Sequence, residues 1–207
     1  DNHKQRMQKL KEKVDSRIDN ATDERGLLIV ITGNGKGKST SGFGTVARAV
    51  GHGLNAAVAQ FIKGTWACGE RQLLENAGVK FSVMGTGFTW NTQDKAKDIA
   101  AAKQVLLKCK KLLRDTNLDL VLLDEMTYML SYKYLDLDEV IEALNNRPKH
   151  QHVIITGRAC HRAIIELADT VSEVQSIKPV TYIHLTLETT NSVYISVCCL
   201  SVKEQNR

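Results

Sequence analysis

The sequence predicts an α/β protein: a three-layer arrangement in which a mainly parallel sheet lies between helices, preceded by an N-terminal helical arm. Three observations lead to this fold class. Short continuous apolar runs alternate with longer amphipathic stretches, which is the pattern of βαβ units whose strands are buried on both faces. A glycine-rich loop follows the first apolar run, and a pair of acids follows a later one.

Length and composition fit a single globular domain with a full-sized core. The chain has 207 residues, of which 43% are hydrophobic and 25% charged, and single domains reach roughly 250 residues before they divide. The net charge of +5 is spread along the chain. Anionic small molecules account for this excess as well as nucleic acid does, and we expect no nucleic-acid partner.

Two further features bear on where the protein works. No stretch approaches the roughly 20 apolar residues of a membrane span, and the first residues mix acids with bases, unlike a signal peptide. The five cysteines form no C-x-x-C pair, which favours free thiols in a reducing compartment; they are Cys68, Cys109, Cys160, Cys198 and Cys199. We therefore expect a cytoplasmic protein without membrane contact and without a zinc site.

An amphipathic helix is predicted for residues 3–22. Its apolar residues recur at three- and four-residue steps and are Met7, Leu10, Val14, Ile18 and Ala21. Such an arm can pack on its own domain, dock on a second subunit or cover a ligand, and the pattern leaves these alternatives open. We assign residues 1–25 to the arm, 26–178 to the main domain and 179–207 to a C-terminal tail.

The first buried strand, predicted for residues 27–31, leads into a glycine-rich loop and the start of a helix. The loop matches the Walker A pattern G-x-x-x-x-G-K-S/T, except that Thr32 stands at the first glycine. Its amides and Lys38 suit a phosphate chain, and the hydroxyl of Ser39 suits Mg²⁺. The alternative is a glycine-rich turn without a ligand. The expected phosphate-binding residues are Gly33, Asn34, Gly35, Lys36, Gly37, Lys38, Ser39 and Thr40.

The next elements are a helix over residues 42–51, a strand over 56–62 and a short helix around 72–74. Ligands collect at strand ends in open α/β sheets. Side chains near the end of this strand are therefore site candidates, although an exposed lysine or arginine is more often only solvated. They are Gln60, Lys63, Trp66, Glu70 and Arg71.

A third strand is predicted over residues 79–84, and a long amphipathic helix over 94–115. The glycine-containing loop between them carries Phe88 and Trp90, although only 5% of the residues are aromatic. These two side chains either plug the core or line an apolar or flat ligand surface. The residues alone do not decide between the two interpretations.

The clearest later strand, residues 118–123, ends in Asp124-Glu125. An acid at the tip of a parallel strand beside a phosphate loop is the Walker B arrangement, which holds Mg²⁺ directly or through water. The alternative is a helix N-terminus with two acids. The two half-motifs support each other because they occur at a suitable separation.

The remaining elements continue the alternation. A helix is predicted over 135–146, a strand over 152–156 followed by Gly157-Arg158, a helix over 161–168 and a last core strand over 171–174. From residue 181 onward, runs of alternating β-formers at 182–185 and 193–197 indicate an added hairpin or a loosely attached segment.

These motifs together resemble the P-loop class of ATP:corrinoid adenosyltransferases. The resemblance runs from the arm to about Lys178 and is more specific than any single motif. It implies a P-loop NTPase (RecA-like) fold. The segments that carry it are Gly33-Asn34-Gly35-Lys36-Gly37-Lys38-Ser39, Gln60-Phe61-Ile62-Lys63-Gly64-Thr65-Trp66, Thr86-Gly87-Phe88-Thr89-Trp90, Leu123-Asp124-Glu125-Met126-Thr127-Tyr128 and Ile155-Thr156-Gly157-Arg158.

The resemblance implies an enzyme that transfers the 5'-deoxyadenosyl group of ATP to a reduced corrinoid, forming a Co–C bond and releasing triphosphate. It also implies roles for particular residues. Ser39 and Glu125, and less directly Asp124, would hold Mg²⁺, for which Mn²⁺ can substitute. Arg48 and Arg158 would help bind the nucleotide. Phe88 and Trp90 would act on the lower face of the corrinoid, leaving cobalt four-coordinate and easier to reduce. Lys38 and Glu125 complete the expected catalytic set.

The family also implies partners. These are ATP, a corrinoid such as cobalamin, cobinamide or cobyrinic acid diamide, a reduced flavoprotein as electron donor, and a second subunit in a homodimer. In the family, the N-terminal helix closes over the corrinoid.

The sequence departs from the family pattern at the C-terminus. After Lys178-Pro179-Val180 the chain no longer resembles the family's Gly-, Ala- and Gln-rich ending. An altered reading frame or retained non-coding sequence would produce such a switch. Two alternatives to the transferase therefore stay open: a P-loop ATPase in which Glu125 activates water, and a corrinoid or nucleotide carrier without turnover.

Overall fold

The computed structural model describes residues 2–20, 23–62, 68–84 and 95–178, together with the backbone of two short strands at 193–196 and 199–202. A six-stranded parallel sheet lies at its centre, with strand order β3-β2-β4-β5-β1-β6. The fold class predicted from the sequence is confirmed. The strands are β1 (Leu28–Thr32), β2 (Ala56–Gln60), β3 (Lys80–Val83), β4 (Leu120–Asp124), β5 (His152–Thr156) and β6 (Thr170–Glu173).

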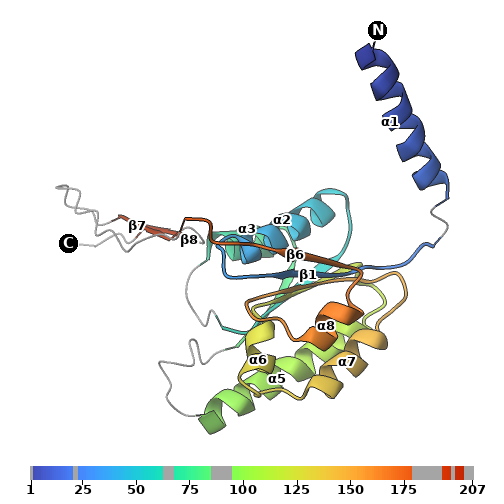
Figure 1. Cartoon of the computed structure of the whole chain (residues 1–207). Helices are drawn as coiled ribbons and strands as arrows, with labels where there is room; N and C mark the ends of the chain where they lie inside the picture. The colour runs from blue at the N-terminus through green and yellow to red at the C-terminus, as the bar shows by residue number, and fades with distance from the viewer. Residues whose placement is uncertain are drawn as a thin grey trace.

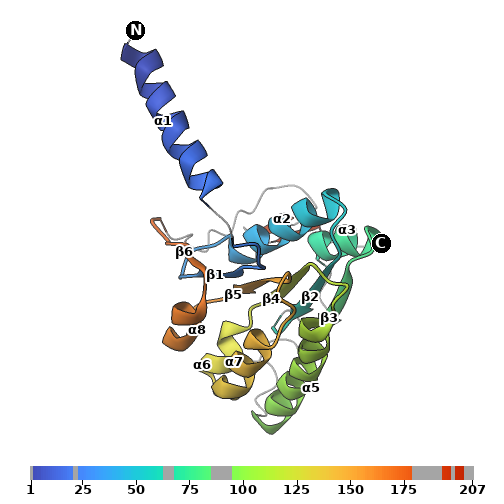
Figure 2. The same cartoon turned by 90° about the vertical axis from the view of Figure 1, so that its right-hand side faces the viewer.

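Helices cover both faces of the sheet (Figures 1 and 2). On one face lie α2 (Lys38–Gly51) and α3 (Gly69–Asn76); on the other lie α5 (Lys95–Arg114), α6 (Thr127–Ser131), α7 (Leu137–Asn145) and α8 (Arg162–Leu167).

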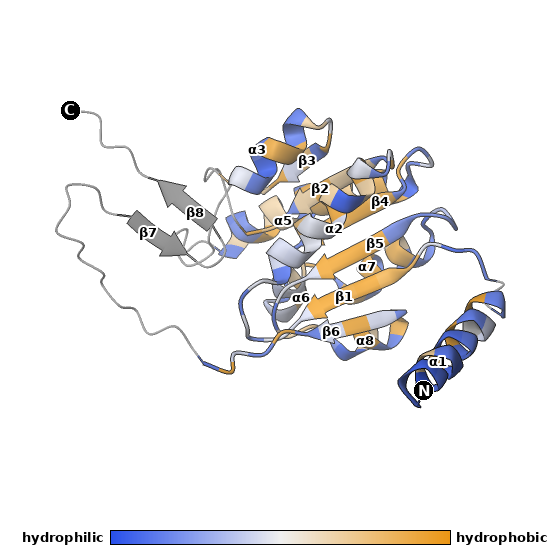
Figure 3. Cartoon of the chain, turned by 90° about the horizontal axis from the view of Figure 1, so that it is seen from above, coloured by the Kyte–Doolittle hydropathy of each residue, from blue (hydrophilic) through white to orange (hydrophobic). Residues whose placement is uncertain are grey.

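Successive residues of a strand point to opposite faces, and this alternation divides the core in two. Leu122 packs with Phe43 of α2, whereas its neighbour Leu123 packs in the cluster that includes Leu113 of α5. Figure 3 shows β1, β4 and β5 as largely hydrophobic, as strands covered on both faces require. Among the described helices, none is long and apolar enough to cross a bilayer.

Most predicted elements agree with the structure to within a few residues. The helix predicted over 94–115 is α5, and β4 ends one residue later than predicted, at Asp124. The helix α6 was not predicted, because five residues are too few to show a helical period.

The tail contains a β-hairpin, but the two strands differ from the predicted pair. The backbone pairs β7 (Val193–Ser196) with β8 (Cys199–Val202) in antiparallel register. The second strand of this hairpin was not predicted. The predicted run at 182–185 lies outside the described residues.

The N-terminal arm is the helix α1 (Asn2–Asp19), which projects away from the sheet (Figures 1 and 2). Its apolar stripe is exposed, with solvent-accessible fractions of 42% for Met7, 53% for Leu10, 44% for Val14 and 64% for Ile18. Of the three alternatives for the arm, packing on its own domain is therefore contradicted by the structure.

Gln151, just before β5, closes the connection between α5 and β4. Its buried side-chain amide donates to the carbonyl oxygens of Leu112 (3.1 Å), Asp115 (3.1 Å) and Leu118 (3.3 Å). We expect Gln151→Ala to lower the free energy of unfolding by about 2–3 kcal/mol, because one buried and two half-buried carbonyl oxygens lose their donor. Urea unfolding would measure it, with exposed Gln104→Ala on α5 as control. An equal, small change in both variants would contradict this role.

Candidate phosphate and metal site

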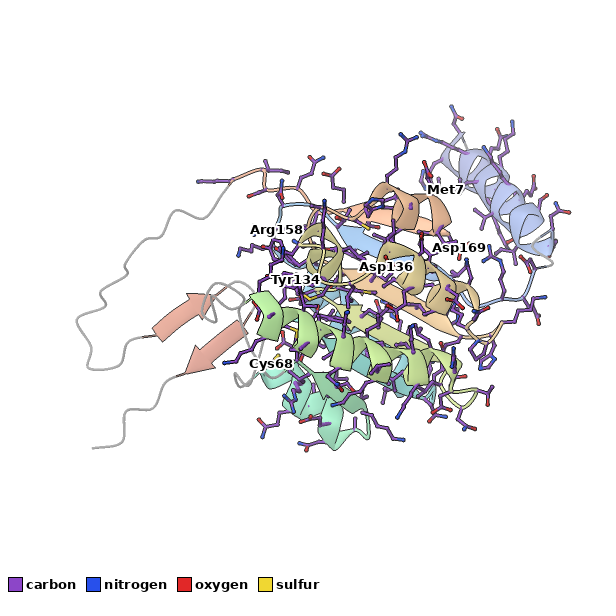
Figure 4. The ribbon with its side chains drawn as sticks, turned by 90° about the horizontal axis from the view of Figure 1, so that it is seen from below. Met7, Cys68, Tyr134, Asp136, Arg158 and Asp169 are labelled. Atoms are coloured by element: carbon purple, nitrogen blue, oxygen red, sulfur yellow. The ribbon has the colours of Figure 1, made fainter. Side chains whose placement is uncertain are left out.

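The candidate site lies at one edge of the sheet. Because the strands are parallel, their carboxyl ends meet there, and the loops after β1, β4, β5 and β6 come together. Figure 4 shows Arg158, which follows β5, and Asp169, which precedes β6, toward opposite ends of the domain.

The glycine-rich loop at residues 33–37, which we call the phosphate loop, runs directly into α2. Gly37, the residue before the helix, has φ 108° and no side chain to cap it, and no acid stands in the first turn. The first amides of a helix lack intrahelical partners and carry partial positive charge, so this helix start suits an anion. Lys38 and Ser39 are buried here, and Lys38 Nζ donates to the carbonyl oxygen of Gly35 at 2.6 Å.

Of the other predicted phosphate-binding residues, Asn34, Lys36 and Thr40 are exposed and Gly33 and Gly37 are half-buried. Gly35 is buried, and its N–H donates to the carbonyl oxygen of Val174 at 2.6 Å. That amide therefore serves the scaffold of the loop.

Val174 and Gln175, which follow β6, pack against the backbone of the phosphate loop, and we call this segment the wall. A Cβ atom on Gly33, which has φ 98°, would lie 2.5 Å from the carbonyl oxygen of Val174. One on Gly35 would lie 2.6 Å from that of Gln175. The glycines at these positions therefore allow this segment to approach. Sequence reasoning missed the wall, since nothing local to residues 174–175 signals it.

The two predicted acids have different environments. Asp124 is fully buried. Its Oδ1 accepts a hydrogen bond from Thr156 Oγ1 at 2.8 Å, and its Oδ2 accepts one from Gln60 Nε2 at 3.1 Å. Glu125 is only half-buried and has φ 61°. Its N–H donates to the same Thr156 Oγ1 at 3.0 Å.

The helix α6 holds the loop that carries Arg158. Thr127 Oγ1 donates to the carbonyl oxygen of Arg158 at 2.6 Å, and Ser131 Oγ donates to that of Ala159 at 3.2 Å. The Arg158 side chain itself is exposed at the edge of the site. The hydroxyl of Thr127 thus holds the backbone at Arg158, whereas the one proton of Ser131 Oγ is shared between the carbonyl oxygens of Ala159 and Thr127, the latter at 3.0 Å.

Gly157 makes this loop sensitive to substitution. It is buried with φ 139°, and a Cβ atom there would overlap Thr127 Oγ1. We expect Gly157→Ala to lower the free energy of unfolding by about 1–3 kcal/mol, because of overpacking, and to weaken nucleotide binding by displacing Arg158. Urea unfolding and calorimetry would measure the two effects.

Gly44→Ala is the matched control for Gly157→Ala. A Cβ atom at Gly44, which lies on the exposed side of α2, meets nothing within 4 Å, and alanine is the better helix former. A Gly157→Ala protein as stable as the control, with unchanged nucleotide affinity, would contradict the loop assignment.

A row of three tyrosines begins near Glu125, although sequence reasoning gave them no role. Burial and the charge of Glu125 raise the pKa of Tyr128, while Arg158 opposes the rise, so its hydroxyl stays protonated at neutral pH. The ring centroids of Tyr128 and Tyr132 are 5.8 Å apart, and those of Tyr132 and Tyr134 are 5.6 Å apart. The aromatic group begins in α6, shortly after β4 ends.

Comparison with known proteins identifies the family of this fold and site. The family model for "ATP:corrinoid adenosyltransferase BtuR/CobO/CobP" matches residues 24–184. The chain belongs to the ATP:corrinoid adenosyltransferase family. A second model, "Cob(I)alamin adenosyltransferase N terminal", matches residues 1–18, which lie in the arm.

Curated members of the adenosyltransferase family align over most of the chain. The corrinoid adenosyltransferase of Escherichia coli K12 is 61% identical over 176 residues, which cover 85% of this chain and 90% of that protein. The Salmonella typhimurium protein CobA gives the same figures. The corrinoid adenosyltransferase of Pseudomonas aeruginosa is 47% identical, covering 85% of this chain and 88% of its own length.

Some of the site residues predicted from the sequence do not lie at the phosphate loop. Arg48 is exposed in the last turn of α2, ten residues after Lys38 and thus about 15 Å further along the helix axis. Glu70 accepts from Cys68 Sγ at 3.1 Å, and Arg71 pairs with Glu75, so both make local contacts in and beside α3. Phe88, Trp90, Lys63 and Trp66 lie outside the described residues.

The donor atoms at this site are hydroxyl and carboxylate oxygens. In the part of the chain that the structure describes, three or more His, Cys, Asp or Glu side chains nowhere gather as a metal cluster. Mg²⁺ at nucleotide sites typically takes one or two carboxylates and completes its shell with phosphates and water. The oxygens of Ser39 and Glu125 fit that mode of binding, whereas both oxygens of Asp124 already accept hydrogen bonds.

Proposed function

We propose that this protein transfers the 5'-deoxyadenosyl group of ATP to the Co(I) centre of a reduced corrinoid and releases triphosphate. The observation that carries the proposal is the 61% identity, over 85% of the chain, to a corrinoid adenosyltransferase. The phosphate loop supports the nucleotide part of the reaction, because a helix start with a buried lysine and a buried hydroxyl suits a polyphosphate.

The proposed reaction requires the leaving group, triphosphate, to be bound tightly. The Co–C5' bond forms as the C5'–O bond of ATP breaks, and the electron pair of that bond leaves with the triphosphate. Amides of the loop and Lys38 Nζ stabilise the accumulating charge. In this step Lys38 would exchange the carbonyl oxygen of Gly35 for phosphate oxygens.

We propose Ser39 and Glu125 as the residues that hold Mg²⁺, or Mn²⁺ in its place. Asp124 would contact the ion through a water molecule, or influence it through Thr156 and Gln60, which donate hydrogen bonds to its carboxylate. The bound ion would supply further positive charge to the leaving triphosphate. We retain Asn34, Lys36 and Thr40 as phosphate contacts, and Arg158 as a nucleotide contact.

We also propose the family's partners for this chain: a homodimer, a reduced flavoprotein as electron donor, and an arm at residues 1–25 that covers the corrinoid or docks on the second subunit. The exposed apolar stripe of α1 supports a role for the arm away from its own domain. The free thiols of Cys68, Cys109 and Cys160 are in keeping with a cytoplasmic location.

The products test the proposal. The protein is incubated without oxygen with ATP, Mg²⁺ and chemically reduced cobalamin, and the products are separated by chromatography. We expect triphosphate and adenosylated corrinoid in equal amounts. ADP and phosphate would contradict the proposal in favour of an ATPase, and binding of both substrates without product would contradict it in favour of a carrier.

A further inference from the structure

Thr156, the last residue of β5, contacts two separate stretches of the chain: the acids at the end of β4, and the helix α2 that follows the phosphate loop. β5 lies between β1, which leads into the phosphate loop, and β4, which leads into the acids (Figure 2). The Thr156 side chain is fully buried. A side chain at this point can therefore reach both the phosphate-loop side and the acid side of the site.

The hydroxyl of Thr156 links the two acids. It donates its one proton to Asp124 Oδ1 at 2.8 Å and accepts the N–H of Glu125 at 3.0 Å, which uses the donor and one lone pair of a hydroxyl. The backbone of Glu125 has φ 61°, a conformation that residues other than glycine rarely adopt. The bond from its N–H to Thr156 helps to hold it there.

The methyl group of Thr156 links these acids to α2. A Cβ atom on Gly42 would lie 3.2 Å from Thr156 Cγ2, so the methyl group packs against the helix one turn after Lys38. Threonine is branched at Cβ, which restricts χ1. With the methyl group seated against Gly42, the hydroxyl is directed toward β4.

We propose that Thr156 is a positioning residue that sets the geometry of the metal-binding acids relative to the phosphate loop. Without its hydroxyl, Asp124 keeps the bond from Gln60, whereas the backbone of Glu125 loses the bond that helps to fix its left-handed conformation. The proposal rests on the proposed function only in that the site binds a metal–ATP complex. It does not depend on which products are formed.

The test compares Thr156→Val, which keeps the branched shape and removes the hydroxyl, with Thr156→Ser, which keeps the hydroxyl. Mn²⁺ binding is followed by electron paramagnetic resonance with the non-hydrolysable β,γ-imido analogue of ATP present. We expect Thr156→Val to weaken Mn²⁺ binding by about 10- to 100-fold, the usual effect of losing a partner behind a metal ligand. Thr156→Ser should stay close to the unchanged protein.

Calorimetry of the same analogue in EDTA separates positioning from general damage, because the metal-free affinity should be equal in all variants. Thr170→Val, an exposed substitution at the opposite edge of the sheet, is the matched control and should behave like the unchanged protein.

Two results would overturn the proposal. One is unchanged Mn²⁺ binding in Thr156→Val. The other is a loss of metal-free nucleotide affinity in Thr156→Val that is as large as its loss of Mn²⁺ affinity. If circular dichroism shows Thr156→Val unfolded, Thr156→Ala carries the same expectation. Formation of ADP in the product assay would count against the transferase and leave this proposal standing.

Discussion

Replacing Lys38 with alanine is expected to lower the rate of adenosyl transfer by about 10²- to 10³-fold, the typical cost of removing one donor to a developing negative charge. Lys38 is 7% exposed at the start of α2, and its Nζ is held over the loop by the carbonyl oxygen of Gly35 at 2.6 Å. ATP binding should weaken as well, because the charge contacts the triphosphate before and during reaction. Steady-state rates with pre-reduced corrinoid, and calorimetry with ATP, would measure both.

Lys80→Ala is the control for this substitution. Lys80 is an exposed lysine at the start of β3. It lies at the amino-terminal end of the strands, whereas the site lies at their carboxyl ends, so the variant removes the same charge without touching the loop. An unchanged rate in Lys38→Ala, or equal losses in the two variants, would refute the assignment of Lys38.

The second large effect is expected from replacing both Phe88 and Trp90 with alanine. If these aromatics displace the lower axial ligand of cobalt, their loss lowers the Co(II)/Co(I) potential. About 59 mV is a factor of ten for a one-electron couple, so a fall of about 120 mV leaves about 100-fold less Co(I) with the same reductant. Reaction from Co(II) should therefore fall far more than reaction from chemically pre-reduced Co(I).

The pre-reduced assay is the internal control of this experiment, because it bypasses the potential and retains every other step. A comparable loss from Co(II) and from Co(I) would remove the proposed role of the two aromatics. It would favour the other interpretation of them, as side chains that support the structure.

The sequence predicted the parts of the site that depend on short stretches of chain. An apolar run followed by Gly37-Lys38-Ser39 requires a strand, a tight loop and a helix, and the structure has these elements in that order. The position of Asp124 at the end of β4 was predictable for the same reason. The layers followed from the alternation of strands and helices.

The remaining features depend on neighbours that are distant in sequence. The left-handed backbone of Glu125 is held by Thr156, 31 residues away, and the apolar run before Glu125 gives no sign of it. Thr156 offered a weak signal, as a polar residue that ends the apolar run of β5. For the tail, the sequence left open a hairpin of another pair of strands and a loosely attached segment, because alternating β-formers do not specify their partners.

The wall behind the phosphate loop has a practical consequence for deletion experiments. Val174 and Gln175 lie against the glycines of the loop, and they belong to the part of the chain that the family model matches. A polypeptide shortened to residue 178 would keep this backing, whereas one that stops at residue 173 would lose it. The smallest fragment that still retains ATP should therefore extend through Gln175, whatever sequence comes after it.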